Sequence, residues 1–137
     1  LIGGGATVFL LARNEQKLQD LAAKLSVPAG QYYTVDITDA NSVDSVVALV
    51  VAGGGVDILI NAVGVGIIKP IETLTHQDFM DSLQINLVGS FNAVKAVLPS
   101  MKEAKKGLII NIPGVLGKVP MAGAAGATGA ATAGAAR

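Results

Sequence analysis

A short apolar run that breaks into an amide and small residues constrains the fold of this chain more than any other feature. Residues 56–60 are rich in β-branched and aliphatic side chains, a pattern typical of a fully buried parallel strand. The run gives way at once to Asn61, Ala62, Val63 and Gly64. Parallel sheets that are covered by helices bind ligands just outside the carboxyl ends of their strands. The sequence therefore predicts a buried strand whose end allows a flat ligand to come close.

The rest of the chain alternates between similar runs and segments with helical periodicity. Apolar runs that predict three further strands lie at residues 7–11, 31–35 and 108–112. Between the strands, apolar residues recur three or four positions apart, which predicts amphipathic helices, and Asn14 and Thr75 are suited to cap two of them. Strands that alternate with helices imply a parallel sheet with helices on both faces. We predict one α/β domain over residues 1–137, with a doubly wound, Rossmann-like sheet.

Composition argues against several classes of site and partner. Lys and Arg together number 10, as do Asp and Glu, so the formal net charge is zero. The chain therefore has no excess positive charge that would favour binding to nucleic acid or to an anionic membrane. The chain has no cysteine, and His76 is its only histidine, so we expect no metal site. Glycines 53–55 and Asp57 interrupt the most apolar stretch, and neither half reaches the roughly 20 residues of a membrane-spanning helix. With no signal peptide in the sequence, we expect a cytoplasmic protein.

Residues 121–137 differ in character from the rest, because they are almost wholly Ala, Gly and Thr. Such a segment has no amphipathic pattern and nothing large to pack. Two interpretations are open: a poorly specified natural tail, or Ala and Gly written in place of side chains that were not identified. Peptide mass spectrometry that returned this tail would exclude the second.

Five motifs in a consistent order resemble those of the classical short-chain dehydrogenase/reductase family. Residues 61–64 are similar to the Asn-Asn-Ala-Gly that ends the family's fourth strand. The other four motifs are Gly5-Ala6-Thr7-Val8 with Ala12-Arg13-Asn14, Asp36-Ile37, residues 85–91 and residues 107–112. The resemblance implies an oxidoreductase that interconverts a carbonyl and a secondary alcohol by hydride transfer. It also implies a homodimer or homotetramer, since the family's long helix packs against its copy in a neighbouring subunit.

The resemblance further implies that the domain is incomplete at both ends. The family's first strand and glycine-rich phosphate loop would precede Leu1. Glycines 3–5 are a poor substitute, because phosphate binding requires a strand before such a loop and a helix after it. The part that completes the sheet and the substrate pocket would follow Arg137.

The residues after the family's second strand predict the cofactor. An acidic residue there accepts hydrogen bonds from the ribose 2′-OH and repels a 2′-phosphate, whereas an arginine accommodates the phosphate. Ala12 takes the acidic position and Arg13 follows it, so we expect NADP(H) rather than NAD(H). By the resemblance, the other cofactor-binding residues are Asp36 and Ile37 beside the adenine, with Asn61, Ala62, Val63, Gly64 and Ile112.

The resemblance assigns the catalytic machinery to four positions. Asn86 matches the asparagine that holds a water linking the catalytic lysine to solvent. The family's serine, tyrosine and lysine positions fall on Gly114, Ala127 and Ala131, whose side chains offer no proton, charge or hydrogen bond. Either unidentified side chains stand there in an ordinary reductase, or the chain is a catalytically silent nucleotide-binding domain that senses or scaffolds. A third hypothesis, a receiver or methyltransferase-like module, would give Asp36 and Asp57 other roles.

Overall fold

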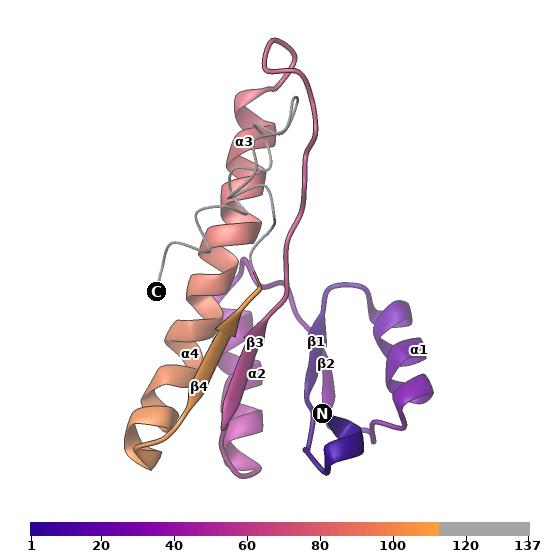
Figure 1. The fold of residues 1–137 in the computed structure, drawn as a ribbon, viewed down its shortest axis with the longest axis vertical. Coiled ribbons are helices and arrows are strands. Elements are labelled where there is room, and N and C mark those ends of the chain that lie inside the picture. The colour runs from indigo at the N-terminus through magenta and orange to yellow at the C-terminus, as the bar shows by residue number, and fades with distance from the viewer. Residues whose placement is uncertain (113–137) are drawn as a thin grey trace.

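The computed structural model describes residues 1–112, in which parallel strands alternate with helices (Figure 1). In chain order the elements are a short 3₁₀ turn (η1, Ile2–Gly4), β1 (Leu10–Ala12), α1 (Glu15–Leu25), β2 (Tyr32–Thr34), α2 (Ala40–Ala52), β3 (Ile58–Asn61), α3 (His76–Leu83), a π-helical turn (η2, Gln84–Val88), α4 (Gly89–Ala104) and β4 (Leu108–Asn111). The predicted order of strands and helices is confirmed. The first strand begins three residues later than the apolar run suggested.

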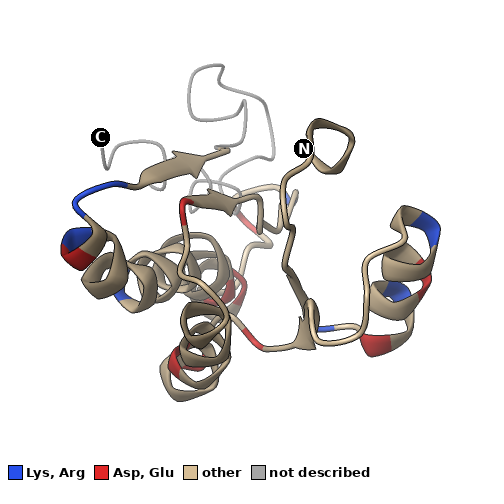
Figure 2. Cartoon of the chain, turned by 90° about the horizontal axis from the view of Figure 1, so that it is seen from below, with Lys and Arg blue, Asp and Glu red and all other residues tan. Residues whose placement is uncertain are grey.

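The strands form two parallel pairs. β1 pairs with β2 in a register that sets Leu11 opposite Tyr33, and β3 pairs with β4 so that Asn61 lies opposite Asn111. Helices α1 and α2 lie on opposite sides of the first pair, whereas α2 and α4 lie on one side of the second (Figure 2). Parallel strands with helices on both faces confirm the doubly wound arrangement.

The core lies between α2, α4 and the strands. Its buried centre consists of Val35, Val43, Val47, Val97 and Met101. Leu59 and Ile109, from the second strand pair, pack against this cluster, so the same core supports both pairs. Each fully buried side chain of this size contributes about 1.5–3 kcal/mol by leaving water. Helices α2 and α4 and both strand pairs therefore share one hydrophobic core.

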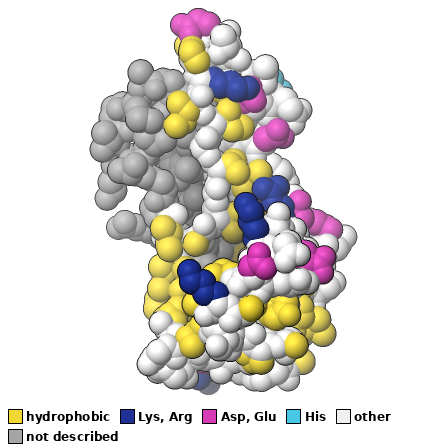
Figure 3. Space-filling view, turned by 90° about the vertical axis from the view of Figure 1, so that its right-hand side faces the viewer, with side chains coloured by type: hydrophobic (Ala, Val, Ile, Leu, Met, Phe, Trp, Pro, Cys, Tyr) yellow, Lys and Arg dark blue, Asp and Glu magenta, His cyan; other side chains and the backbone are white. Residues whose placement is uncertain are grey.

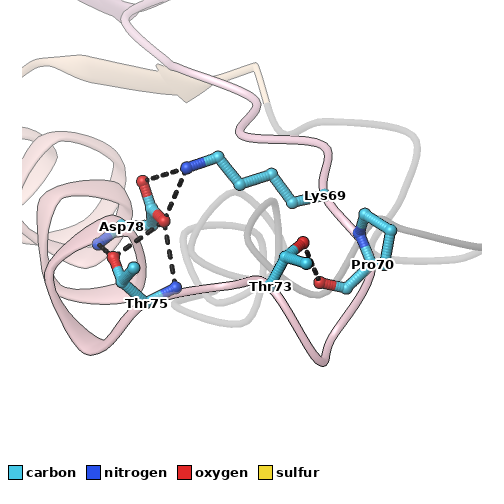
Figure 4. A network of polar contacts seen from close by, with 5 residues as sticks. All are labelled: Lys69, Pro70, Thr73, Thr75 and Asp78. Atoms are coloured by element: carbon cyan, nitrogen blue, oxygen red, sulfur yellow. Dashed lines mark hydrogen bonds and ion pairs between the residues drawn. The ribbon is translucent and has the colours of Figure 1, made fainter.

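Local sequence sets the starts of the helices. The Asn14 side chain accepts a hydrogen bond from the Lys17 backbone N–H at 2.8 Å, as the sequence predicts for an N-cap. Thr75 and Asp78 form a reciprocal capping box at the start of α3. The ammonium of Lys69 reaches Asp78 at 2.7 Å and ties the preceding loop to this cap (Figure 4).

The long helix differs from its expected continuous form. A π-helical turn separates α3 from α4, and the extra residue in such a turn shifts the phase of the side chains that follow. Leu87 and Phe91, which the periodicity assigns to the apolar face, are 37% and 60% exposed. Asn86 and Gly89 are buried instead. Near the π turn, small and polar side chains thus face the rest of the molecule, whereas Val97 and Met101 do so further along α4.

Charged side chains of both signs are interspersed on the face drawn in Figure 3. Among the helices of residues 1–112, none has the length and apolar character to cross a membrane.

Candidate functional site

The predicted cofactor residues form two groups, each at the carboxyl ends of a strand pair. Arg13, Asp36 and Ile37 follow β1 and β2, whereas residues 61–64 and Ile112 end or follow β3 and β4. Ligands of doubly wound sheets bind at such ends. Within the second group, the fold therefore brings together residues about 50 positions apart in the chain.

The first group forms a corner that combines a cation, Arg13, with an anion, Asp36. The Val35 N–H donates to the Ala12 carbonyl at 3.0 Å, which carries the pairing of β1 and β2 up to Arg13 and Asp36. The Asp36 carboxylate accepts hydrogen bonds from the Thr38 N–H at 2.9 Å and the Thr38 hydroxyl at 2.8 Å. These bonds, helped by the charge of Arg13, hold the pKa of Asp36 below its usual 3.8. The carboxylate is therefore ionised at neutral pH.

An open cavity of about 600 Å³ adjoins this corner. Its lining residues come from the end of β1 and the first turns of α1: Ala12, Arg13, Asn14, Lys17, Leu18 and Leu21. Two of these side chains, Arg13 and Lys17, are cationic and exposed. The cavity thus combines positive charge with a small apolar floor, a chemistry that suits an anionic group.

The second group is held by an amide pair. The side-chain N–H of Asn61 donates to the side-chain oxygen of Asn111 at 2.8 Å, and the backbone N–H of Ile112 donates to the Asn61 carbonyl at 2.9 Å. Asn61 is only 7% exposed, whereas Ala62, Val63 and Gly64 are exposed beyond it. The strand therefore ends in a fixed buried amide followed by accessible small residues.

Asn86 lies at the same end and is 2% exposed. Its side-chain oxygen accepts from the Val65 N–H at 2.8 Å, and its amide N–H groups donate to the Val65 carbonyl at 2.9 Å and to Ser82 Oγ at 3.2 Å. Both N–H groups are thus engaged within the protein. A water held by Asn86 would have to donate to its remaining side-chain lone pair or to its backbone carbonyl, which also accepts from the Ser90 hydroxyl.

Gly64 is part of the same arrangement, because a Cβ at this position would lie 3.3 Å from the Asn86 side-chain oxygen. Such a contact is tighter than ordinary packing, so a side chain here would displace the amide. The small residue predicted to admit a ligand also makes room for Asn86.

Two residues of α4 to which the sequence analysis gave no role attach the first group to this helix. Asn92 donates to the Ile37 carbonyl at 3.0 Å, and a Cβ on Gly89 would lie 2.6 Å from Ile37 Cγ2. An asparagine and a glycine inside a helix are both unfavourable by propensity. Their presence in the buried line of α4 is a signal that could have indicated a close polar contact.

The residues at the family's serine, tyrosine and lysine positions, Gly114, Ala127 and Ala131, lie outside the described residues. Asp57 lies at the opposite ends of β3 and β4, where it pairs with Lys106 at 2.8 Å. Asp36 and Asp57 therefore do not share a site, which removes the basis of the receiver-like hypothesis.

Comparisons with known proteins agree with this geometry. The model of the short chain dehydrogenase family matches residues 1–136. An uncharacterized oxidoreductase of Staphylococcus aureus is 32% identical over 82% of this chain and 49% of its own length. D-threitol dehydrogenase of Mycolicibacterium smegmatis is 37% identical over 79% of this chain and 43% of its own length. The chain thus spans about half the length of these relatives.

Solved structures show the same fold. Sorbitol-6-phosphate 2-dehydrogenase from Erwinia amylovora superposes with a TM-score of 0.86 and 31% identity, over 97% of this chain and 54% of its own. Actinorhodin polyketide ketoreductase with NADPH superposes with a TM-score of 0.87 and 30% identity, over 96% and 52%. Together with the family match, these similarities show that the chain belongs to the short-chain dehydrogenase/reductase family.

Proposed function

We propose that this chain is the dinucleotide-binding part of an NADP(H)-dependent reductase that interconverts a small-molecule carbonyl and a secondary alcohol. The nicotinamide would supply the hydride when bound, and the protein would bind and orient it. Arg13 and Asp36 would lie at the adenosine end, with residues 61–64 and Ile112 toward the nicotinamide.

The corner after β1 and β2 carries the cofactor proposal. Arg13 is exposed and lies beside a cavity with a second cation, Lys17, and the acidic residue that would repel a 2′-phosphate is replaced by Ala12. A guanidinium binds phosphate through charge-assisted, bidentate hydrogen bonds. One solved relative is described with NADPH and an alcohol dehydrogenase from Thermococcus sibiricus with 5-hydroxy-NADP, which also supports NADP(H).

The test is the substitution Arg13→Asp in the purified protein, with both nucleotides titrated by calorimetry. Losing charge-assisted bonds to the phosphate should weaken NADPH by roughly 10- to 100-fold, while NADH holds or gains. Lys24→Asp makes the same change of charge in the last turn of α1, away from the corner, and should leave the ratio of affinities unchanged. Equal binding of both nucleotides by the unmodified protein would contradict the proposal.

The second candidate is a catalytically silent nucleotide-binding domain. It is favoured by Gly114, which lies before the Ala- and Gly-rich tail yet takes the family's serine position. NADPH binding without turnover of any ketone would support this alternative. Identification of the residues at positions 114, 127 and 131 from the DNA sequence would decide whether the catalytic groups are present.

We also propose that the protein forms a homodimer or homotetramer through the α3–α4 rod. Met80, Leu87 and Phe91 are 42%, 37% and 60% exposed along it, so residues 1–112 leave this apolar surface uncovered. Sedimentation velocity would test the oligomeric state, and a monomer as the main species would contradict this proposal. The cytoplasmic location stays a prediction from the sequence.

A further inference from the structure

We infer that Asn92 is a positioning residue that fixes the Asp36-Ile37 turn for the adenine end of the nucleotide. The inference rests on the proposed function, because it assigns a task to another residue of the same site.

The first observation is a buried amide that reaches across the molecule. Asn92 is 7% exposed, and its side-chain N–H donates to the carbonyl of Ile37, which lies 55 positions earlier in the chain. A buried amide is costly unless it is hydrogen-bonded. The burial of Asn92 is therefore compensated when the Ile37 turn is docked on α4.

Gly89 provides the space for this docking. It lies three residues before Asn92 and thus on the same face of the helix. A Cβ at Gly89 would stand 2.6 Å from Ile37 Cγ2 and 3.3 Å from Cγ1. The missing side chain lets Ile37 pack directly on the helix backbone. Two neighbouring features of α4 therefore converge on one residue of the turn.

The other bonds of the turn are local. Asp36 accepts from the Thr38 N–H and hydroxyl, and the Asp39 N–H donates to the Asp36 carbonyl at 3.1 Å. These bonds set the shape of the turn and its approach to α2, but they do not set its place relative to α4. Asn92 supplies the connection to α4.

The docked turn presents a donor and an acceptor side by side. Within residues 1–112, no hydrogen bond engages the Ile37 N–H or the second oxygen of the Asp36 carboxylate. Adenine offers the complementary pair, an amino donor and a ring-nitrogen acceptor. The turn is thus chemically suited to an adenine edge, provided that its backbone is held in place.

The same rod also holds the loop after β3. Asn86, six residues before Asn92 and about 9 Å along a helix axis, binds both backbone groups of Val65. One rod therefore fixes the turn after β2 and the loop after β3 relative to each other. Releasing Asn92 should disturb the adenine end and leave the nicotinamide end in place.

The test is Asn92→Leu in the full chain of the protein, with calorimetric titration of NADPH, adenosine 2′,5′-bisphosphate and reduced nicotinamide mononucleotide. Loss of one positioning hydrogen bond should weaken the first two ligands by roughly 3- to 10-fold and the mononucleotide by less than about twofold. Ser100→Ala removes a side-chain hydrogen bond within α4, eight residues further along the helix, and should leave the relative affinities of the three ligands unchanged.

Equal weakening of all three ligands by Asn92→Leu would overturn the inference, because it would indicate a general structural role. Hydrogen exchange separates this result from a failure of the proposed function. Faster exchange of the Thr38 and Asp39 amides in Asn92→Leu than in Ser100→Ala supports the positioning role, and unchanged exchange refutes it. Absence of binding of all three ligands to the unmodified protein would instead contradict the proposed function.

Discussion

Three buried asparagine side chains form hydrogen bonds that hold the segments at the strand ends in place. Asn61, Asn86 and Asn92 are each at most 7% exposed, and each bonds to a residue at least 21 positions away in the chain. An amide both donates and accepts, so it can satisfy backbone groups that a loop leaves unpaired. The irregular segments after the strands are thus held by specific polar contacts as well as by packing.

The pair Asn61–Asn111 allows a direct measurement of one such contact. Asn111→Ala leaves the buried N–H of Asn61 without its partner and should lower the free energy of unfolding by about 1–2 kcal/mol. In a double-mutant cycle with Asn61→Ala, we expect a coupling energy of about 0.5–1.5 kcal/mol. Urea unfolding would measure both quantities.

Asn41→Ala is the control, because Asn41 is an exposed residue of α2 and its replacement should change stability by less than about 0.5 kcal/mol. Additive effects of the Asn61 and Asn111 substitutions would contradict an energetic link between the two strand ends.

At the scale of elements, the sequence predicts features that depend on neighbouring residues, such as helix caps, but not contacts between distant residues. The caps at Asn14 and Thr75 are confirmed, because a cap depends on residues only three positions apart. The bond between Asn92 and Ile37 joins residues 55 apart, so no sequence window contains it. The π turn at Gln84–Val88 likewise has no local signature, and Phe91, which follows it, is 60% exposed.

The capping network of α3 predicts a pH dependence. A hydrogen bond from Lys69, followed by bonds from the N–H and hydroxyl of Thr75, lowers the pKa of Asp78 from 3.8 to about 2. Between these values the unfolded chain binds more protons at Asp78 than the folded chain. This carboxylate therefore adds stability that is fully present above about pH 4 and is lost as the pH falls toward 2.

We expect Asp78→Asn to reduce the loss of stability between pH 4 and pH 2, measured by urea unfolding at each pH. The remaining loss has other sources, including Asp36 and Asp39, whose pKa values are also lowered by hydrogen bonds. Asp81→Asn removes the same charge from α3 outside the network and should keep the parent's steeper loss. Identical profiles for Asp78→Asn and the parent would exclude a contribution from the capping network.

At the scale of the whole molecule, the second strand pair has one uncovered face within the described residues. α2 and α4 pack on one side of β3 and β4 (Figure 2). On the other side Ile58, Ile60, Leu108, Ile110 and Ile112 are each 38–59% exposed. Sheets of this class normally have both faces covered. The chain spans about half the length of its relatives, so we expect this face to make the isolated 137-residue chain prone to associate.

A paired substitution tests that expectation. Ile60 and Ile110 lie opposite each other in the register, and changing both to threonine should lower self-association and binding of an apolar dye. The free energy of unfolding should change by less than about 1 kcal/mol, since both side chains are already partly exposed. Leu59→Thr, on the covered face, should instead cost about 2 kcal/mol or more. Unchanged association in the double variant would show that this face is not responsible.

The sequence was sufficient for the parallel α/β fold and for the family, because alternating apolar runs and short motifs are both local features of a sequence. It was not sufficient for the connection between the two strand pairs, which depends on α4 docking against the Ile37 turn. This docking depends on the rotation of α4 about its axis, on the missing Cβ of Gly89 and on the position of the Ile37 carbonyl, which is distant in the sequence. These relations exist only in the folded chain.

Thermal unfolding of the protein with and without nicotinamide nucleotides tests the central claim most directly. A ligand that binds only the folded state raises the melting temperature, and at a fixed concentration the rise is larger for the ligand with the lower Kd. We predict a larger rise with NADPH than with the same concentration of NADH. An unchanged melting temperature with both nucleotides, or a larger rise with NADH, would contradict the assignment of an NADP(H) site to the corner formed by Arg13 and Asp36.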